Sequence, residues 1–388
     1  ARIQVKNMEE FYLSHYTRGA QPTLKKNILL LVPHFSLGGQ EQVALRTADI
    51  LKNDYNVYIA VLTMKDCVYD IPYDVIDLDV PARNGIIFKV INVFRRVRKT
   101  RRLKKELKID VSISFGTTAN IQNVFSKVKD RAIVSVRGYS SLVDNVIWKL
   151  FDRILYNKAD AVVCVSRKMA EDFVKLYGID RKKVFAIYNP YDIGELHRKS
   201  VETFDGYSFS FPTIVTMGRL NKIKGYWHLV KAFSQVKKIY SDAKLVFIGD
   251  GVDQEKLGNL AKDMNIADSV IFTGFQINPH RILSKCDIFV MSSISEGFPN
   301  AMVEAMACGL PVVSVDCMTG PREILTNGNI NMVTEDIEHG DYGILTPPVT
   351  AMENYQADAI EHCDYILGKA INELLADRTL LDRYKKIS

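Results

Sequence analysis

The chain has 388 residues, of which 47% are hydrophobic and 25% are charged, and its formal net charge is +6. One hydrophobic core seldom supports a chain of this length, so we expect about two domains. The six cysteines show no CxxC or CxxH spacing, which disfavours a structural zinc site or a disulfide framework. No apolar run reaches the roughly 18 residues that span a bilayer, and the N-terminus lacks the layout of a signal peptide. We therefore expect a cytoplasmic protein that is soluble or peripheral on a membrane.

Short β-branched runs alternate with helical stretches along the chain, which is the pattern of parallel sheets covered by helices on both faces. After residue 346 the pattern becomes helical, and 358–386 predicts one or two helices. The sequence therefore predicts an α/β protein with two doubly wound domains. The predicted strands are 27–33, 56–62, 74–78, 109–115, 131–136, 161–165 and 184–188 in the first half, and 213–217, 244–248, 269–273, 287–291, 311–315 and 343–345 in the second.

The boundary between the two halves is predicted near residue 195. The residues Asn189-Pro190-Tyr191-Asp192 have turn chemistry, and 206–210 is a polar stretch before the next strand. This gives a first domain at 1–195, a second domain at 196–365 and a last helical segment at 366–388.

The first predicted strand is followed by PHFSLGGQE, in which Gly38 and Gly39 precede a helical stretch. Glycines at a strand-to-helix turn let a phosphate or an acceptor approach the backbone and the helix N-terminus. A tight turn without a ligand explains the same pair. His34 lies at the edge of this turn and is a candidate contact for a sugar or an acceptor.

The stretch 83–108 carries eleven Lys or Arg and one acid, Glu106. Hydrophobic residues recur in it at helical spacing, so one face of a helix is apolar and the other is cationic. Such a helix can lie on an anionic membrane, with about 1 kcal/mol gained per basic residue near the lipid. A surface helix packed on a sheet is the alternative, and no nucleic-acid motif accompanies the charge. The residues predicted to face the membrane are Arg95, Arg96, Arg98, Lys99, Arg101, Arg102, Lys104 and Lys105.

The second half opens with a strand that ends in Gly218-Arg219, and Lys224 follows five residues later. Ligands bind at the carboxyl ends of the strands in open α/β sheets. Arginine can bind a phosphate through two parallel hydrogen bonds, and lysine supplies a point charge. A solvated basic loop is the alternative. Glycine turns at 249–251 and 273–275 follow the next two strands and lie at the same edge of the sheet.

The stretch SEGFPNAMVEAMACGLPVVSVD, residues 295–316, carries Glu296 and Glu304 eight residues apart, across a turn that opens a helix. The turn offers backbone N–H groups and the positive end of a helix, which suit a phosphate or a sugar hydroxyl. Glu304 lies about two helical turns further on, where it can reach a ribose. The two acids are therefore predicted to hold opposite ends of one ligand, although a plain amphipathic helix can show the same spacing.

Taken in this order over most of residues 27–346, the motifs resemble the retaining GT-B glycosyltransferases of family four, whose Glu-x7-Glu motif is matched by Glu296 and Glu304. The resemblance implies two Rossmann-like domains that face each other across a cleft, with the last helix returning to the first domain. It also implies transfer of a hexose or an N-acetylhexosamine from a nucleotide-diphosphate sugar, with retention and without a required metal or cofactor.

The resemblance assigns roles to particular residues. Glu296 would contact the hydroxyls of the donor sugar, and Arg219 and Lys224 would stabilise the departing diphosphate; these three are the predicted catalytic residues. Glu304 would hold the ribose, and Phe275 would contact the base through its backbone. The other predicted donor contacts are Gly38, Gly39, Gly218, Gly249, Gly251, Gly297, Phe298 and Asn300.

Arg137 is a departure from the family, many members of which have a histidine after the strand matched by 131–136. Arginine does not lose its proton in proteins, so it cannot act as a general base. We interpret Arg137 either as a contact to an anionic group of the acceptor or donor, or as a member of a structural ion pair. The leaving phosphate itself is then the candidate proton acceptor.

The predicted donor is UDP-linked rather than GDP-linked, because 295–314 followed by DCxxGPREIL is similar to members that build bacterial surface glycans. The basic stretch adds the expectation of a lipid-linked saccharide acceptor at the cytoplasmic face of the inner membrane. Two other functions stay open: a non-catalytic nucleotide-sugar or membrane-binding protein, and a nucleotide-sugar epimerase of the same fold. The Asp-Leu-Asp at 77–79 matches a metal motif of the other major glycosyltransferase fold but is interpreted as a strand end, and the seven histidines lack metal-binding spacing.

Overall fold

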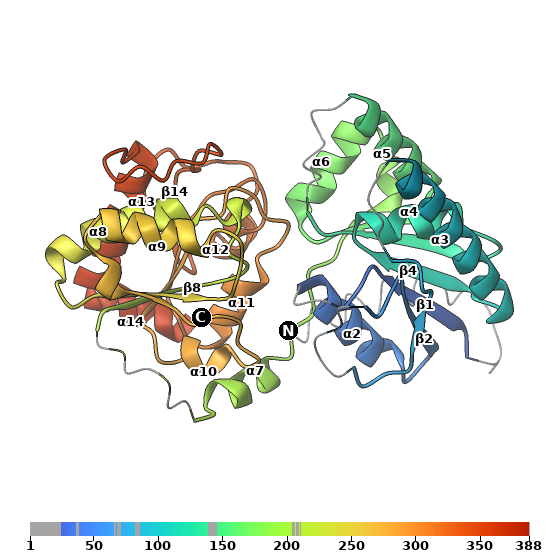
Figure 1. Ribbon diagram of the computed structural model, residues 1–388, viewed down its shortest axis with the longest axis horizontal. Helices are drawn as coiled ribbons and strands as arrows, with labels where there is room; N and C mark the ends of the chain where they lie inside the picture. Colours follow the sequence, from blue (N-terminus) through green and yellow to red (C-terminus); the bar gives the residue numbers. More distant parts are fainter. Residues whose placement is uncertain are drawn as a thin grey trace. The chain divides into compact units, whose positions relative to one another are not determined.

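A computed structural model describes residues 25–35, 39–65, 67, 71–81, 86–138, 146–203, 206, 209 and 211–387. The chain divides into two compact units, 1–191 and 192–388, and each has helices on both sides of a central sheet (Figure 1). Within the described ranges, no helix is both long enough and apolar enough to cross a membrane.

The first unit contains a seven-stranded parallel sheet with the order β3-β2-β1-β4-β5-β6-β7. Its middle strands are buried runs of Leu, Ile and Val because helices cover both faces, and this explains why their sequences are apolar without alternation. The strands are β1 (Asn27–Val32), β2 (Asn56–Val61), β3 (Val75–Asp77), β4 (Val111–Phe115), β5 (Arg131–Val136), β6 (Ala161–Cys164) and β7 (Val184–Ala186), and the helices are α2 (Gly39–Leu51), α3 (Ile86–Glu106), α4 (Thr117–Phe125), α5 (Val146–Lys158) and α6 (Arg167–Tyr177).

The second unit has the same architecture, with the order β10-β9-β8-β11-β12-β14-β13. The strands are β8 (Thr213–Met217), β9 (Lys244–Ile248), β10 (Val270–Phe272), β11 (Ile288–Met291), β12 (Val312–Val315), β13 (Glu338–His339) and β14 (Ile344–Thr346). The helices are α7 (Ile193–Ser200), α8 (Tyr226–Ile239), α9 (Gln254–Asp263), α10 (His280–Leu283), α11 (Asn300–Ala307), α12 (Pro321–Leu325), α13 (His362–Ala376) and α14 (Arg378–Ile387), with 3-10 turns at Arg181–Lys183, Lys222–Lys224 and Ala267–Ser269.

The thirteen predicted strands are confirmed, and each lies within two residues of its predicted limits. The additional strand, β13, has two residues and pairs antiparallel with β14 at the edge of the sheet. Two residues cannot display an alternating pattern, so no sequence pattern indicated this strand. The predicted strand end at 77–79 is also confirmed, since Asp77 ends β3 and its carboxylate accepts the backbone N–H groups of Met64 and Asp79.

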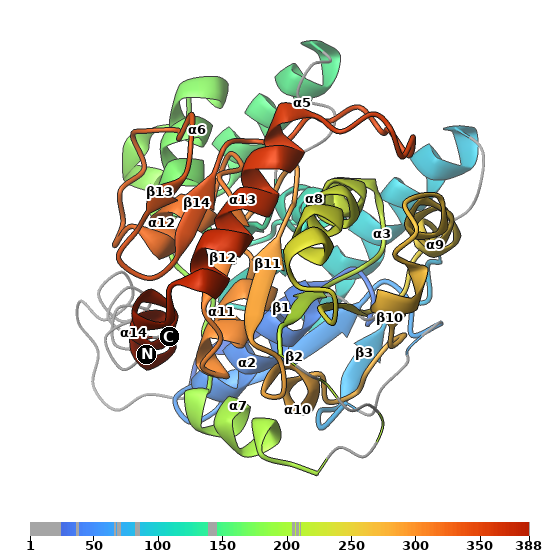
Figure 2. The same cartoon turned by 90° about the vertical axis from the view of Figure 1, so that its left-hand side faces the viewer.

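The C-terminal helices contribute to the core of the second unit. α13 packs against α8, β12 and β14, as Figure 2 shows, and Leu381 and Tyr384 of α14 are buried in the same core. The Tyr384 hydroxyl donates a hydrogen bond of 2.9 Å to the Gly340 carbonyl. The predicted return of 366–388 to the first domain stays a prediction.

α3 packs on the rest of the first unit through several polar side chains and Leu103, and leaves much of its predicted apolar stripe exposed. Asn92, Thr100 and Lys104 are buried, whereas Val90, Ile91 and Phe94 are exposed, Phe94 by 72%. The alternative of a helix packed through that stripe is therefore wrong for these residues. Exposed basic side chains follow along the helix: Arg95, Arg98, Lys99, Arg101, Arg102 and Lys105.

Three of the residues predicted to face a membrane direct their charged groups toward the protein: Lys104, Arg96 and Lys99, whose Nζ donates to the Leu78 carbonyl over 2.6 Å. Lys104 is fully buried, with its Nζ 2.8 Å from Asp130 Oδ2 and 2.7 Å from Asn123 Oδ1, so its predicted role is wrong. Arg96 is half-buried and donates to the Val80 carbonyl. The cause is position: Asn92, Arg96, Thr100 and Lys104 recur every four residues, which places them on the inner face of the helix.

Candidate active site

The predicted donor-site residues of the second unit lie at the carboxyl edge of its sheet. Arg219 follows β8, 249–251 follows β9, Phe275 follows β10, and Glu296 follows β11. Because parallel strands end at one edge, residues up to 77 positions apart in sequence come to the same side of the domain, where open α/β sheets bind ligands.

Lys224 and Glu296 form a direct ion pair in this edge, with 2.7 Å between Nζ and Oε1. Their side chains are 22% and 13% exposed, so the pair is shielded but reachable. Ser293 Oγ donates to the same Oε1 over 2.7 Å, and Thr319 Oγ1 donates to the Glu296 carbonyl. Burial by itself would lower the pKa of Lys224, but the nearby Glu296 carboxylate raises it above its ordinary value. The site therefore holds a charged ammonium in a fixed place.

The backbone around Lys224 fixes this geometry. The Ile294 N–H donates to the Ile223 carbonyl over 2.8 Å, and Ser292 Oγ donates to the Lys224 carbonyl over 3.0 Å. Gly225 lies in the left-handed region, with φ of 58°, and a Cβ there would collide with the Ser292 carbonyl. Glycine is thus required between Lys224 and α8 for the two loops to approach each other.

The glycines predicted to contact the donor shape the neighbouring loops. A Cβ at Gly249 would collide with the Gly218 carbonyl, and a Cβ at Gly251 with the Leu220 carbonyl. The Leu220 N–H donates to the Asp250 carbonyl over 2.8 Å, which holds the same loops together. Close backbone packing therefore accounts for these glycines, and their contact with a donor stays a prediction.

Arg219 and Phe275 border this edge of the domain. The Arg219 side chain is exposed, and its guanidinium has no partner among the residues that the structure describes. The Phe275 N–H donates to Asp250 Oδ2 over 2.7 Å, so Phe275 presents its carbonyl as its other backbone polar group. If the backbone of Phe275 contacts the base, its carbonyl is the group available, and the base must offer a hydrogen-bond donor.

Glu304 lies one turn before the end of α11 and is approached by a histidine that the sequence did not suggest. His280 Nε2 is 3.4 Å from Glu304 Oε2, and their side chains are 8% and 17% exposed. The His280 ring is anchored on its other side, where Nδ1 is 3.2 Å from Asn278 Oδ1. The two residues are 24 positions apart, and only the packing of α10 against α11 joins them.

The turn before α11 contains the remaining donor candidates. Gly297 is buried, Phe298 is half-buried and Asn300 begins the helix. A Cβ at Gly320, where φ is 96°, would collide with the Pro299 ring, so the loop after β12 packs directly on this turn. The predicted helix start after the Gly-Phe-Pro-Asn turn is confirmed, and the ligand contacts stay predictions.

The first-unit candidates lie at the carboxyl edge of their own sheet. Gly38 is outside the described residues, and Gly39 begins α2. His34 follows β1 with its ring half exposed, 3.8 Å from the buried Glu41 carboxylate. Arg137 is half-buried after β5 and donates to Ser135 Oγ over 3.1 Å and to Asn189 Oδ1, with its guanidinium over the Phe115 ring.

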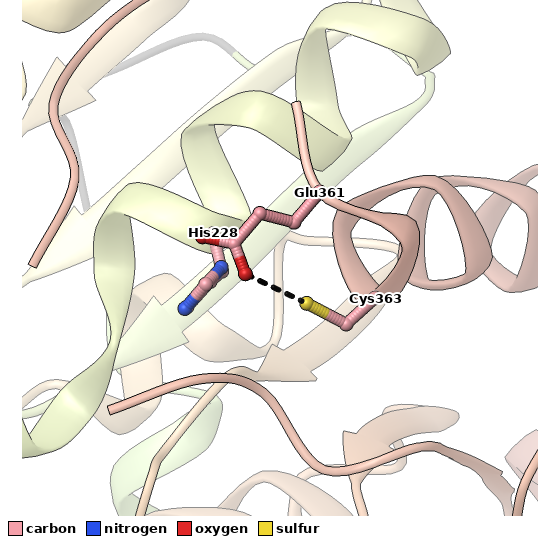
Figure 3. Close-up of side chains that lie close together, drawn as sticks. All are labelled: His228, Glu361 and Cys363. Atoms are coloured by element: carbon pink, nitrogen blue, oxygen red, sulfur yellow. Dashed lines mark hydrogen bonds between the residues drawn. The ribbon is translucent and has the colours of Figure 1, made fainter. Parts of the chain in front are cut away.

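His228, Glu361 and Cys363 bring three metal-ligating atoms within 4.8 Å of one another (Figure 3). His228 Nδ1 is 2.5 Å from Asp364 Oδ1, however, and its Nε2 is 3.0 Å from the Thr350 carbonyl. Two acceptors call for two protons on the ring, and an imidazolium has no lone pair for a metal. Burial lowers the pKa of His228, but hydrogen bonds to Asp364 and its neighbours raise it to about 9. The cluster therefore joins α8 to the C-terminal helices.

Comparisons with known proteins agree with this geometry. The model of "Glycosyltransferase Family 4" matches residues 37–195, and that of "Glycosyl transferases group 1" matches residues 209–346. The N-acetylgalactosamine-N,N'-diacetylbacillosaminyl-diphospho-undecaprenol 4-alpha-N-acetylgalactosaminyltransferase of Campylobacter jejuni is 28% identical, over 77% of this chain and 83% of that protein. A second transferase of that organism, named as adding N-acetylgalactosamine to a longer diphospho-undecaprenol saccharide, is 23% identical over 78% of this chain and 82% of its own length.

Solved structures resemble the chain in fold. Anabaena Alr3699/HepE in complex with UDP and glucose superposes with a TM-score of 0.68 at 19% identity, over 92% of each chain. Sucrose-phosphate synthase from Thermosynechococcus elongatus also gives 0.68, at 17% identity, over 94% of each chain. The two Rossmann-like sheets, the motif order and the two family matches lead to one conclusion: the chain belongs to glycosyltransferase family 4 and has the GT-B fold.

Proposed function

We propose that the protein transfers a hexose or an N-acetylhexosamine from a UDP-linked donor, with retention of configuration, to a saccharide carried on a lipid. The observation that carries the proposal is the ion pair of Lys224 and Glu296, with Arg219 and Glu304 at the same edge of the second sheet. The two cations suit the diphosphate of a nucleotide sugar, and the two carboxylates suit the hydroxyls of its sugar and its ribose.

In this mechanism, Lys224 and Arg219 neutralise the charge that develops on the diphosphate as the bond to the sugar breaks. Such a preorganised charge acts most strongly where water is partly excluded, as it is around Lys224. Glu296 keeps Lys224 in place and offers its carboxylate to the sugar hydroxyls. With Arg137 where many relatives have histidine, the leaving phosphate accepts the proton of the attacking hydroxyl on the same face of the sugar. In this proposal Lys224, held by Glu296, and the exposed Arg219 take the place of a divalent metal.

Glu304 binds the ribose in this proposal, and the Phe275 carbonyl accepts a hydrogen bond from the base. The N3–H of uracil is a donor of the required kind. The HepE structure that shares the fold was solved with UDP, which supports a UDP donor.

The proposed acceptor is a saccharide on a lipid diphosphate at the cytoplasmic face of a membrane. Both Campylobacter relatives are named for diphospho-undecaprenol acceptors. In this chain, α3 presents exposed Phe88, Ile91 and Phe94 in its first half and basic side chains in its second. This arrangement suits shallow insertion into an anionic membrane surface.

A thermal-shift screen tests the donor site. UDP, GDP, ADP and their common sugars are compared with and without EDTA, on the wild type and on Glu304→Ala. A ligand at 100 times its Kd stabilises the folded protein by about 2.7 kcal/mol. We expect an EDTA-insensitive shift with UDP that weakens in the variant. A preference for another nucleotide, or a shift that needs metal, would contradict the assignment.

Arg137 favours one rival function, a protein that binds nucleotide sugars without transferring them. A transfer assay distinguishes the transferase from the binding protein. It uses radiolabelled UDP-sugars and a lipid-linked saccharide, extracted from membranes, as the acceptor. Product with retained anomeric configuration supports the transferase. Saturable UDP binding without transfer or donor hydrolysis supports the binding protein.

A further inference from the structure

Tyr226, the first residue of α8, follows Lys224 by two positions and is buried in the second unit. Its side chain is 3% exposed, and its ring meets the ring of Phe247, in β9, edge to face, with 5.2 Å between the ring centroids. Aromatic pairs favour this arrangement. The ring is therefore anchored in the core, and the position of the Tyr226 hydroxyl is fixed with it.

The Tyr226 hydroxyl and the end of the Lys224 side chain converge on Gly218. A Cβ added at Gly218 would lie 3.0 Å from the Tyr226 hydroxyl oxygen, 3.1 Å from Lys224 Cε and 3.5 Å from Lys224 Nζ. The Gly218 N–H donates to the Ile248 carbonyl over 2.9 Å, and the Gly218 carbonyl lies against Gly249, so this backbone is fixed. Two side chains from the start of α8 thus share the space in front of Gly218.

The Tyr226 hydroxyl is also held by Thr216, a buried residue of β8. The two hydroxyls share a hydrogen bond. Burial raises the pKa of Tyr226, so its hydroxyl stays protonated and neutral. Because the side chain is enclosed by the core, it acts on a bound donor only through its neighbours, and the neighbour that proposedly meets the diphosphate is Lys224.

We propose that Tyr226 is a positioning residue for the transfer reaction, and that its hydroxyl keeps the Lys224 side chain beside Glu296. This inference rests on the proposed function and adds a residue to it. An ion pair fixes only the end of a lysine side chain, whose four-carbon stem is flexible. The Tyr226 hydroxyl fills space in front of Gly218 that the stem would otherwise enter, so the ammonium stays 2.7 Å from the Glu296 carboxylate.

Reductive methylation of lysines, read by mass spectrometry, tests the position of Lys224 without any assay of transfer. Full-length protein is treated with formaldehyde and cyanoborohydride, and the labelling rates of Lys224 and Lys222 are compared in the wild type and in Tyr226→Phe. Only the unprotonated amine reacts, so Lys224 paired with Glu296 should label slowly. We expect its rate to rise about fivefold in Tyr226→Phe, because a displaced ammonium loses part of the stabilisation by Glu296. The exposed Lys222 should keep its rate.

The same variant tests the consequence for the reaction. Tyr226→Phe should lower kcat about tenfold and leave the KM for the UDP-sugar within about twofold, because a misplaced ammonium matters most for the charge that develops as the bond to the sugar breaks. In a Lys224→Ala background the same substitution should cause no further loss, since Tyr226 acts through that lysine.

Tyr384→Phe is the matched control. It removes another buried tyrosine hydroxyl from the same unit, but one that donates to the Gly340 carbonyl. Each variant loses one buried hydrogen bond, so urea unfolding should show similar losses of stability in the two. The control should keep the wild-type kcat and the wild-type labelling of Lys224. An equal loss of kcat in both variants would mean that the unit is loosened in general, which overturns the inference.

The two assays separate this inference from the proposed function. Unchanged labelling of Lys224 in Tyr226→Phe overturns the inference, whatever the activity. Faster labelling with an unchanged kcat, or a loss of kcat that persists in the Lys224→Ala background, also overturns it. If the wild type transfers sugar from no UDP donor, the proposed function fails, and faster labelling still identifies Tyr226 as the residue that positions Lys224.

Discussion

At the residue scale, the ion pair of Lys224 and Glu296 is both a structural contact and the centre of the proposed chemistry. Lys224 holds the Glu296 carboxylate, and that carboxylate keeps the ammonium protonated. The exposed Lys222, two positions earlier on the same 3-10 turn, lacks such a buried partner, because its Nζ is 3.8 Å from the exposed residue Glu353. The two lysines therefore differ in function although they are close in sequence.

Replacing Lys224 by alanine should lower kcat by about 100- to 1,000-fold, the usual cost of losing one preorganised group that stabilises developing charge. Lys222→Ala is the matched control and should keep nearly the wild-type kcat. Initial rates with saturating UDP-sugar check the prediction. Equal losses in the two variants would show that Lys224 has no special role in the reaction.

His280→Ala should weaken UDP binding about tenfold, because Glu304 loses a neighbour that helps to fix its carboxylate, and about 1.4 kcal/mol corresponds to a factor of ten. Calorimetric titration with UDP measures the change. In a Glu304→Ala background the same substitution should have no further effect. A full additional loss there would mean that His280 acts independently of Glu304.

The stability contributed by His228 should depend on pH. Its pKa of about 9 in the folded protein lies above its ordinary value of 6.5, so the folded state binds the proton more tightly. The contribution, about 3 kcal/mol, is fully present below pH 6.5 and is lost as the pH rises through about 9. Urea unfolding of wild type and His228→Gln across this range should show their difference shrinking. A difference that grows with pH would contradict the assignment of an imidazolium.

At the element scale, α3 shows how a helix can be anchored by polar groups. Lys104 and Asp130 are both fully buried, and Ser112 Oγ adds a hydrogen bond of 2.6 Å to the Asp130 carboxylate. Burial lowers the pKa of Lys104 to about 8, while Lys104 and these hydrogen bonds keep the pKa of Asp130 below its usual value. The outer face of the helix is thereby left for other contacts.

Substitution of Lys104 should lower the stability of the protein, whereas substitution of its neighbour Lys105 should lower its binding to membranes. Lys104→Ala leaves the Asp130 charge buried without its partner and should cost about 3–5 kcal/mol of stability, with vesicle binding of the folded fraction unchanged. Lys105→Ala should leave stability within about 0.5 kcal/mol and weaken binding to anionic vesicles several-fold. Denaturant unfolding and vesicle sedimentation check the pair. Weaker vesicle binding by folded Lys104→Ala would contradict the burial of this lysine.

At the scale of the whole molecule, each unit has its own sheet and its own hydrophobic core. The core of the second unit includes α13 and α14, and its buried residues all lie between 214 and 384. The proposed UDP contacts Arg219, Lys224, Glu296 and Glu304 belong to this unit as well. The unit therefore contains a hydrophobic core of its own and these four proposed UDP contacts.

A fragment of residues 192–388 should fold cooperatively and bind UDP within about tenfold of the full chain, because both properties depend on contacts inside this unit. It should have no transferase activity, since the proposed acceptor contacts lie in the first unit. Thermal unfolding, UDP titration and a transfer assay test these three statements. A fragment that folds but does not bind UDP would place essential donor contacts in the first unit.

The strands could be predicted because parallel strands buried on both faces are continuous apolar runs, a signal that each run carries by itself. The positions of Arg219 and Glu296 could be predicted because each comes after such a strand, and the order of the strands places their carboxyl ends at one edge. Their contact with a donor stays a prediction. The contact of His280 with Glu304 and the burial of Lys104 could not be predicted, because each depends on a partner distant in sequence. His280 meets Glu304 through helix packing, and Lys104 looks like any other lysine of its basic helix.

The sequence by itself determined the fold class and the family, since apolar periodicity and short motifs are local properties of the chain. Only the tertiary structure decided which side of α3 faces the protein, that Lys224 and Glu296 are in contact, and that the Tyr226 hydroxyl meets Lys224 at Gly218. The physical reason is that burial and pairing are set by the packing of elements far apart along the chain. The sequence gives the type of each side chain, whereas the packing of the whole domain determines which groups surround it.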